Sequence, residues 1–170
     1  NGVGKQLEEP LSRIIFPKYR KDETRISEQE LKQVFIEQLN KEIKNKDWDV
    51  YYSVETPTEK KYRFKGKDEP EQDDSGRSGN FDLVIHNNKF ERIALIEFKA
   101  NNPKSKDYLK DIVKLNEENC EGKVLRYFIQ IVRNSNGTTK NNLHKKMKDN
   151  EDIYWCYSLE EGKIINSSKK

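Results

Sequence analysis

Two short apolar runs in the middle of the chain each carry charge at positions where a buried strand usually has none. The runs are residues 81–85 and 94–100, both rich in aliphatic, β-branched or aromatic side chains. A turn-forming segment between them predicts a hairpin of two neighbouring strands. Side chains alternate between the faces of a strand, so Glu97 and Lys99 share one face. If Asp82 points the same way, two carboxylates and an ammonium converge, which suits a divalent cation with a polarised water beside it.

Periodicity and chain breakers predict the other elements. Ser27 opens the strongest helix signal, with apolar residues three or four positions apart as far as Ile43. Thr56-Pro57 is expected to end the first long strand, and residues 58–80 are predicted to form a mobile loop. The remaining expected elements are helices at 10–16, 103–119 and 141–148 and strands at 48–56, 125–132 and 153–159.

The charged residues of the central hairpin resemble the motif of the PD-(D/E)xK nuclease superfamily. Asp82 matches its first acid, and the run Glu97-Phe98-Lys99 matches its E-x-K, with a spacing of 97 − 82 = 15 positions that fits one hairpin. The position before the first acid holds no proline, which departs from the family's name. The resemblance covers about residues 26–133. It implies an α/β fold, with a three-layer, restriction-endonuclease-like αβββαβ core and a mixed central sheet flanked by helices.

The same resemblance implies a metal-dependent endonuclease that hydrolyses phosphodiester bonds of DNA, of the restriction, repair or mobile-element kind, with RNA as the other substrate to consider. Asp82 and Glu97, aided by the main-chain carbonyl of Phe98, would hold Mg²⁺ or Mn²⁺. Lys99 would orient the attacking water and neutralise developing charge. A homodimer or a larger defence or repair complex is compatible with this reading. The alternative is a non-catalytic nucleic-acid-binding or protein-interaction module on the same fold, with the acids retained as structural charges.

The superfamily commonly adds a glutamate from the first long helix. At 100° per residue Glu28 lies in the apolar sector of that helix, so we expect it to join the catalytic residues. Glu30 is the reserve, although Ser27-x-x-Glu30 also has the form of a capping box. Glu55, near the end of the strand at 48–56, is a further candidate to complete the site.

Basic residues suggest where nucleic acid would lie. Arg77, at the end of the predicted loop, could grip a phosphate near the scissile one through its guanidinium. A run of lysines along the helix at 103–119 could follow a phosphate backbone, although such a run equally suits a solvated face; its members are Lys104, Lys106, Lys110 and Lys114.

Bulk properties are compatible with this interpretation without requiring it. The chain has 170 residues, a net charge of +3, 32% hydrophobic residues and a mean hydropathy of −1.11. These values predict a single domain, 1–170, with a compact core and a charged coat. Cys120 and Cys156 lack metal-ligand spacing, which favours a reduced, cytoplasmic location. No apolar run reaches transmembrane length and no signal-peptide pattern opens the chain, so no membrane partner is expected.

Overall fold

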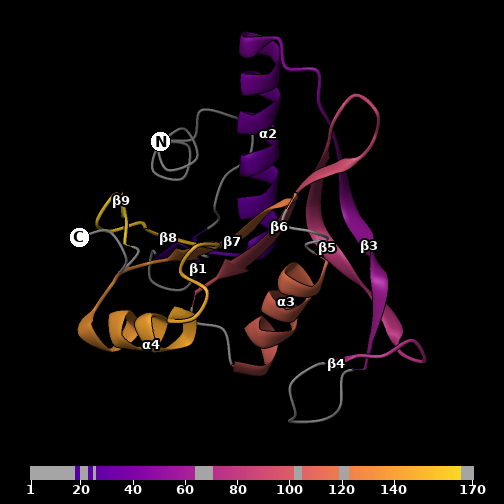
Figure 1. The fold of residues 1–170 in the computed structure, drawn as a ribbon. Helices are drawn as coiled ribbons and strands as arrows, with labels where there is room; N and C mark the ends of the chain where they lie inside the picture. Colours follow the sequence, from indigo (N-terminus) through magenta and orange to yellow (C-terminus); the bar gives the residue numbers. More distant parts are fainter. Residues whose placement is uncertain are drawn as a thin grey trace. The chain divides into compact units, whose positions relative to one another are not determined.

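The computed structural model describes residues 18–19, 23–24, 26–63, 71–101, 105–118 and 123–165. These residues form an α/β fold with three helices, a mixed seven-stranded sheet and a separate two-stranded ribbon. The strand order in the large sheet is β4-β3-β5-β6-β7-β8-β9 (Figure 1). The α/β class predicted from the sequence is therefore confirmed.

Most elements lie where periodicity predicts them, with shifted ends. The helices are α2 (Glu28–Lys46), α3 (Ser105–Glu117) and α4 (Gly137–Met147). The longer strands are β3 (Tyr51–Arg63), β5 (Arg77–His86), β6 (Arg92–Ala100), β7 (Leu125–Val132) and β8 (Tyr154–Ser158). Four further strands have two residues each: β1 (Lys18–Tyr19), β2 (Glu23–Thr24), β4 (Glu71–Gln72) and β9 (Lys163–Ile164). The short helix predicted at 10–16 lies outside the described residues.

The predicted central hairpin and the start of the first long helix are confirmed. β5 and β6 pair antiparallel, with Leu83 opposite Ile96. α2 begins directly after Ser27, whose hydroxyl accepts a hydrogen bond from the Glu30 N–H at 3.4 Å. This bond satisfies a main-chain donor that the first helical turn leaves without an intrahelical acceptor.

The larger differences from the sequence prediction are at the end of β3, the start of β5 and the start of α4. β3 does not end at Pro57 but continues to Arg63, and its register with β5 shifts between Pro57 and Lys61. Proline lacks the N–H that a regular ladder uses, and a strand accommodates it at such an irregularity. Strand therefore replaces three parts of the expected loop at 58–80, namely the end of β3, the short β4 and the start of β5, and the mobility of that segment stays a prediction. α4 begins four residues early, because the side chain of Asn136 accepts the Thr139 N–H and caps it.

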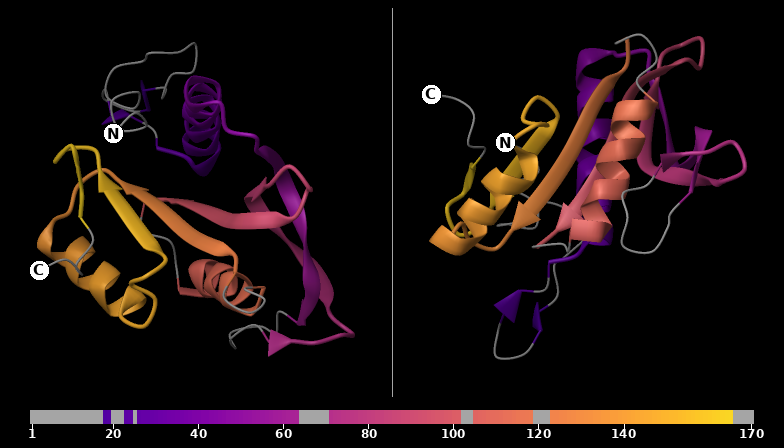
Figure 2. Two further views of the ribbon diagram at one scale, coloured as in Figure 1. Left: turned by 45° about the horizontal axis from the view of Figure 1, so that its top comes forward. Right: turned by 60° about the horizontal axis from the view of Figure 1, so that its bottom comes forward.

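The chain forms two compact units. The first unit comprises residues 1–48, 98–102 and 130–170, and the second comprises 49–97 and 103–129. In the first unit α4 lies beside β8 (Figure 2), and the ring of Phe98 meets that of Phe35 on α2 edge-on, with centroids 5.2 Å apart. In the second unit α3 packs against the hairpin strands through buried polar contacts.

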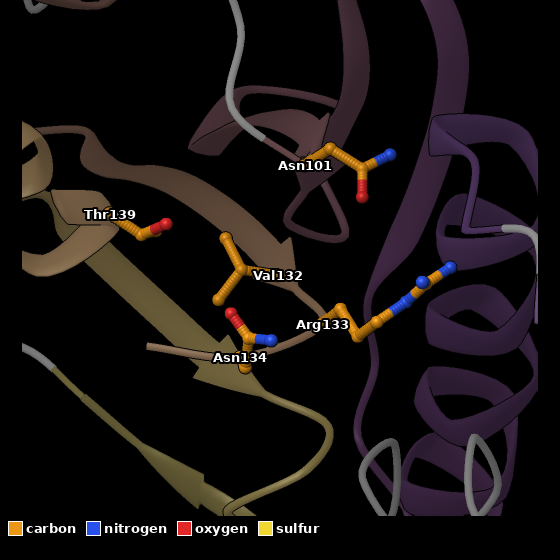
Figure 3. A pocket seen from close by; sticks show the side chains of 5 residues that line it. All are labelled: Asn101, Val132, Arg133, Asn134 and Thr139. Carbon is orange, nitrogen blue, oxygen red and sulfur yellow. The ribbon is translucent and has the colours of Figure 1, made fainter. Parts of the chain in front are cut away.

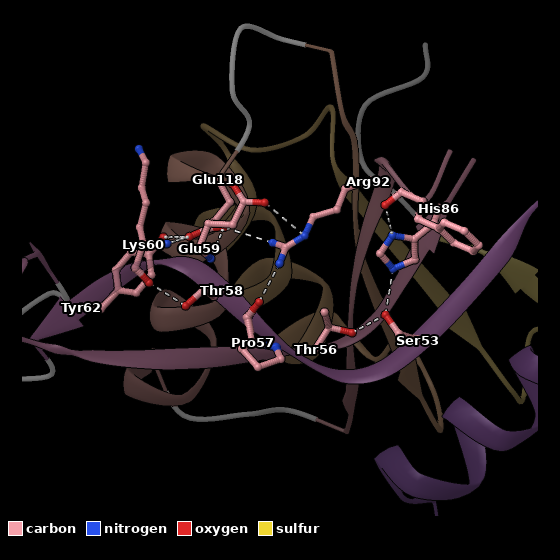
Figure 4. Close-up of polar contacts among 11 residues, drawn as sticks. Ser53, Thr56, Pro57, Thr58, Glu59, Lys60, Tyr62, His86, Arg92 and Glu118 are labelled. Atoms are coloured by element: carbon pink, nitrogen blue, oxygen red, sulfur yellow. Dashed lines mark hydrogen bonds and ion pairs between the residues drawn. The ribbon is translucent and has the colours of Figure 1, made fainter. Parts of the chain in front are cut away.

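The buried carboxylate of Glu118, just after α3, holds that helix end on β3 (Figure 4). It accepts hydrogen bonds from the main-chain N–H groups of Glu59 and Lys60 at 2.9 and 2.7 Å. It also accepts the hydroxyl of Tyr62 at 3.0 Å, and Tyr62 is itself 1% exposed. These donors lie at the register shift of β3, so the carboxylate satisfies main-chain groups where the strand is irregular.

Arg92 supplies the opposite charge for this carboxylate. A guanidinium nitrogen lies 3.4 Å from Glu118 Oε2, and a second donates to the carbonyl of Pro57 at 2.9 Å. One planar group thus links β6, the end of α3 and the irregular part of β3.

Replacing Glu118 should therefore destabilise the protein strongly. We expect Glu118→Ala to lower the free energy of unfolding by about 3 kcal/mol, because it leaves Arg92 and the donors on β3 without their buried acceptor. Urea unfolding measures this change. The matched control is Glu117→Ala, since Glu117 is exposed and its ion pair with Lys60 spans 3.6 Å; it should change stability by less than about 1 kcal/mol. Equal effects of the two substitutions would contradict the role of Glu118.

Candidate metal and catalytic site

Charged side chains gather in the second unit where β5, β6 and α3 meet. Glu97 and Asp82 each lie one residue beyond the paired residues Leu83 and Ile96 of the hairpin. Glu97 is 2% exposed, although it is a carboxylate on a strand of an otherwise apolar run. The structure therefore brings together the two acids that the sequence motif selects, and it buries one of them.

Lys114 of α3 is the direct partner of Glu97. Its ammonium lies 2.5 Å from Glu97 Oε1 and 2.9 Å from Asp111 Oδ1, and it donates to the carbonyl of Asn80 at 2.7 Å. The methylene stem of Lys114 passes so close to β5 that a Cβ added at Gly79 would lie 2.8 Å from its Cδ. Glycine at position 79 thus provides the space through which this lysine reaches the acids.

Burial and neighbouring charges alter the ionisation of this pair. Burial, with the negative charges of Asp111 and Asp82, raises the pKa of Glu97 well above its ordinary value of 4.5, although Lys114 opposes the rise. Burial by itself lowers the pKa of Lys114, but attraction to Glu97 and Asp111 outweighs it and the pKa is raised. The effect of Asp82 on Glu97 shows that the two acids are electrostatically coupled.

The raised pKa of Glu97 predicts a pH-dependent stability. The proton on Glu97 is held more tightly in the folded chain, so this contribution is fully present below pH 4.5 and is lost as pH rises through the raised value. Glu97→Gln should therefore flatten the stability profile of the metal-free protein in that window, as measured by urea unfolding between about pH 4 and about pH 8. Lys114 titrates in the unfolded chain only near 10.5, above this range. Glu91→Gln on the exposed hairpin turn is the control and should follow the wild-type profile; a parallel profile for Glu97→Gln would contradict the assignment.

Lys99 and Glu28 meet in the first unit. Lys99 Nζ donates to Glu28 Oε2 at 3.5 Å, and the two side chains are 10% and 45% exposed. The helical acid expected to join the catalytic residues thus contacts the lysine of the motif, whereas Glu30 provides the main-chain N–H that Ser27 caps. On β6 itself, Lys99 follows Glu97 by two positions.

Glu55 lies on β3 opposite Asp82, whereas Arg77 lies further along β5. Glu55 is exposed, has a left-handed φ of 48°, and falls between the register pairs on β3 that flank Asp82. It therefore stays a candidate for the acidic group. Arg77 lies five residues before Asp82 on β5, which is about 16 Å along a strand. The predicted contact of Arg77 with a phosphate near the scissile one stays a prediction.

The lysine run is only partly described. Lys104 lies outside the described residues, as does the side chain of Lys106, and Lys110 is exposed on α3. Lys114 is 5% exposed and ion-paired, so it does not belong to a solvent-facing track.

Sequence reasoning missed Asp111 and the role of Lys114. Both lie within the apolar stripe of α3, at the spacing that joins the buried residues Tyr108, Ile112 and Leu115. A charged residue inside an apolar helical stripe is the same signal that pointed to Glu28, and applying it to this helix would have found them.

The donor groups fit a hard divalent cation held partly by water. Among the described residues, no group of three or more His, Cys, Asp or Glu side chains is placed to hold an ion. Mg²⁺ commonly uses one or two carboxylates and keeps several waters, so Asp82 and Glu97 meet its requirement. The fit rests on the two neighbouring acids: burial raises the pKa of Glu97 most, Asp111 and Asp82 raise it further, and a cation would favour the ionised form against all three.

A separate cavity of about 360 Å³ lies in the first unit (Figure 3). The described residues that line it are mostly polar and include a guanidinium: Asn101, Val132, Arg133, Asn134 and Thr139. Cys156, in the same unit, is buried, and burial raises the pKa of its thiol to about 11, which makes it a poor nucleophile.

No family model, curated protein or solved structure matches this chain. In the part of the chain that the structure describes, no helix is both long and apolar enough to cross a membrane.

Proposed function

We propose that the chain is a metal-dependent endonuclease that hydrolyses phosphodiester bonds of DNA. The observation that carries the proposal is the coupled pair of acids at the end of the central hairpin, with Glu97 buried and its pKa raised by burial, Asp111 and Asp82. Like charges close together in a protein interior are unfavourable without a cation, and groups perturbed in this way concentrate at functional sites.

The order of elements supports a restriction-endonuclease-like core. Apart from the two-residue β4, the sequence α2, β3, β5, β6, α3, β7 follows the αβββαβ order, and β3, β5, β6 and β7 are neighbours in the sheet. Asp82 stands on the second of these strands and Glu97 and Lys99 on the third.

Asp82, Glu97 and the main-chain carbonyl of Phe98 would hold Mg²⁺ or Mn²⁺. When bound, the cation lowers the pKa of a bound water and stabilises negative charge on the phosphate. Lys99 would donate a hydrogen bond to the attacking water or to a phosphate oxygen, where its charge favours the transition state. Glu28 would keep the Lys99 ammonium in position through the contact at 3.5 Å. Arg77 and Lys110, both exposed, are the described members of the basic set proposed to bind nucleic acid.

Substituting either acid should abolish the chemistry without unfolding the protein. We expect Asp82→Asn and Glu97→Gln each to lower Mg²⁺-dependent cleavage of plasmid DNA at least about 100-fold, because each removes a charged oxygen ligand. Asp74→Asn, on an exposed turn, is the control and should cut at the wild-type rate. Wild-type rates in the site variants, with DNA still cut only when Mg²⁺ is present, would sink the assignment.

Lys99→Met tests the second role. It should reduce kcat at saturating Mg²⁺ by at least about 100-fold while Mn²⁺ affinity stays near wild type or rises, because the lysine acts on the reacting groups and not as a ligand. Lys89→Met, at the exposed hairpin turn, should leave both quantities unchanged. A variant that loses metal affinity but keeps its kcat would instead make Lys99 a structural residue.

One observation favours the alternative of a non-catalytic module on the same fold. Glu97 and Lys99 are each already ion-paired within the chain, to Lys114 and Glu28 respectively. DNA binding without cleavage, together with a Tm that Mg²⁺ and Mn²⁺ do not raise, would establish this alternative, because a ligand of the native state must stabilise it.

A further inference from the structure

We propose that Lys114 is an internal counter-ion that occupies Glu97 in the metal-free protein, competes with the divalent cation for it, and so sets the cation affinity of the site. This inference rests on the proposed function, because it assumes that Glu97 is a metal ligand. It assigns Lys114 as a positioning residue that acts through Glu97.

Each N–H donor of the Lys114 ammonium has an acceptor within the chain. An ammonium has three N–H donors, and the three acceptors around Lys114 are Glu97 Oε1 at 2.5 Å, Asp111 Oδ1 at 2.9 Å and the Asn80 carbonyl at 2.7 Å. The residue is 5% exposed, so solvent has little access to this ion pair. Lys114 is therefore held against the carboxylate before any substrate arrives.

The charges of the group leave room for one divalent cation. Asp82, Glu97 and Asp111 carry three carboxyl groups, and Lys114 carries one positive charge. When all the acids are ionised, the negative excess equals the charge of one Mg²⁺ or Mn²⁺. A divalent cation at Asp82 and Glu97 would balance this excess.

The cation and the ammonium nevertheless share one carboxylate. A cation that takes Glu97 Oε1 as a ligand must displace or repel the Lys114 ammonium, since two positive charges would otherwise meet on the same oxygen. Asp111 lies one helical turn before Lys114 and contacts the same nitrogen. When Glu97 binds the cation, Lys114 keeps its ion pair with Asp111. The exchange therefore leaves no buried ammonium without an opposite charge.

The test measures cation binding at one fixed pH with metal-free protein. Lys114→Gln removes the charge while keeping an amide that can donate to Asn80 or Glu97. We expect it to bind Mn²⁺ at least about tenfold more tightly than wild type in calorimetric titration, because a competing positive charge is gone. Its metal-free Tm should fall and its rise in Tm with Mn²⁺ should exceed that of wild type. Lys89→Gln, on the exposed hairpin turn of the same unit, is the matched control and should bind as wild type does.

A second variant keeps the test decisive if Lys114→Gln does not fold without metal. Asp111→Asn removes the carboxylate that would receive Lys114, so it should weaken Mn²⁺ binding severalfold, opposite in sign to Lys114→Gln. Mn²⁺-dependent recovery of the Lys114→Gln fold would also support the proposal. Equal or weaker Mn²⁺ affinity in folded Lys114→Gln, or unchanged affinity in Asp111→Asn, would overturn the counter-ion role while leaving the endonuclease proposal in place. If neither wild type nor Lys114→Gln binds Mn²⁺, the metal-dependent function and this inference both fail.

Discussion

The buried ion pair between Glu97 and Lys114 is the constraint on which the second unit depends. Removing both charges from water is unfavourable, and only close contact with further hydrogen bonds offsets that loss. The contacts to Asp111 and the Asn80 carbonyl supply those bonds. Because the ammonium also bonds the backbone of β5, the pair fixes the position of α3 on the hairpin as well as the charge of Glu97. Gly79 belongs to the same constraint, since a larger residue would meet the lysine stem.

Glu118 and Glu97 are both buried acids with contacts to the α3 segment, but the charges and donors around them differ. Glu118 accepts from two main-chain N–H groups and a tyrosine hydroxyl, and the charge of Arg92 opposes its own. The group around Glu97 instead has more carboxylates than cations, and its pKa is raised. An acid whose donors and opposite charge are complete is explained by the fold alone. The excess of carboxyl groups around Glu97 is the feature on which the proposed divalent-cation site depends.

How far the sequence predicts this arrangement depends on how local each interaction is. The hairpin and α2 were predictable because alternation, helical spacing and the Ser27 cap are encoded within a few residues. Asp82 and Glu97 were found because charge interrupted apolar strands. The continuation of β3 past Pro57 was not predictable, since it is tied to Glu118, almost sixty positions away. Lys114 looked like one more member of a solvated lysine run, and only tertiary packing shows that it meets Glu97, seventeen positions earlier.

The two lysines associated with the acidic motif are suited to different tasks by their surroundings. Lys99 contacts Glu28 at 3.5 Å, and the two side chains are 10% and 45% exposed, so only the glutamate end of this pair is open to solvent. Lys114 is held by three close acceptors in a buried position, and leaving any one of them requires a replacement charge. In the proposed function the Lys99 ammonium turns to a phosphate oxygen or a water. In the proposed counter-ion role Lys114 responds to the cation that binds Glu97. The motif lysine is therefore the better candidate for contact with substrate, and the helical lysine for control of the metal ligand.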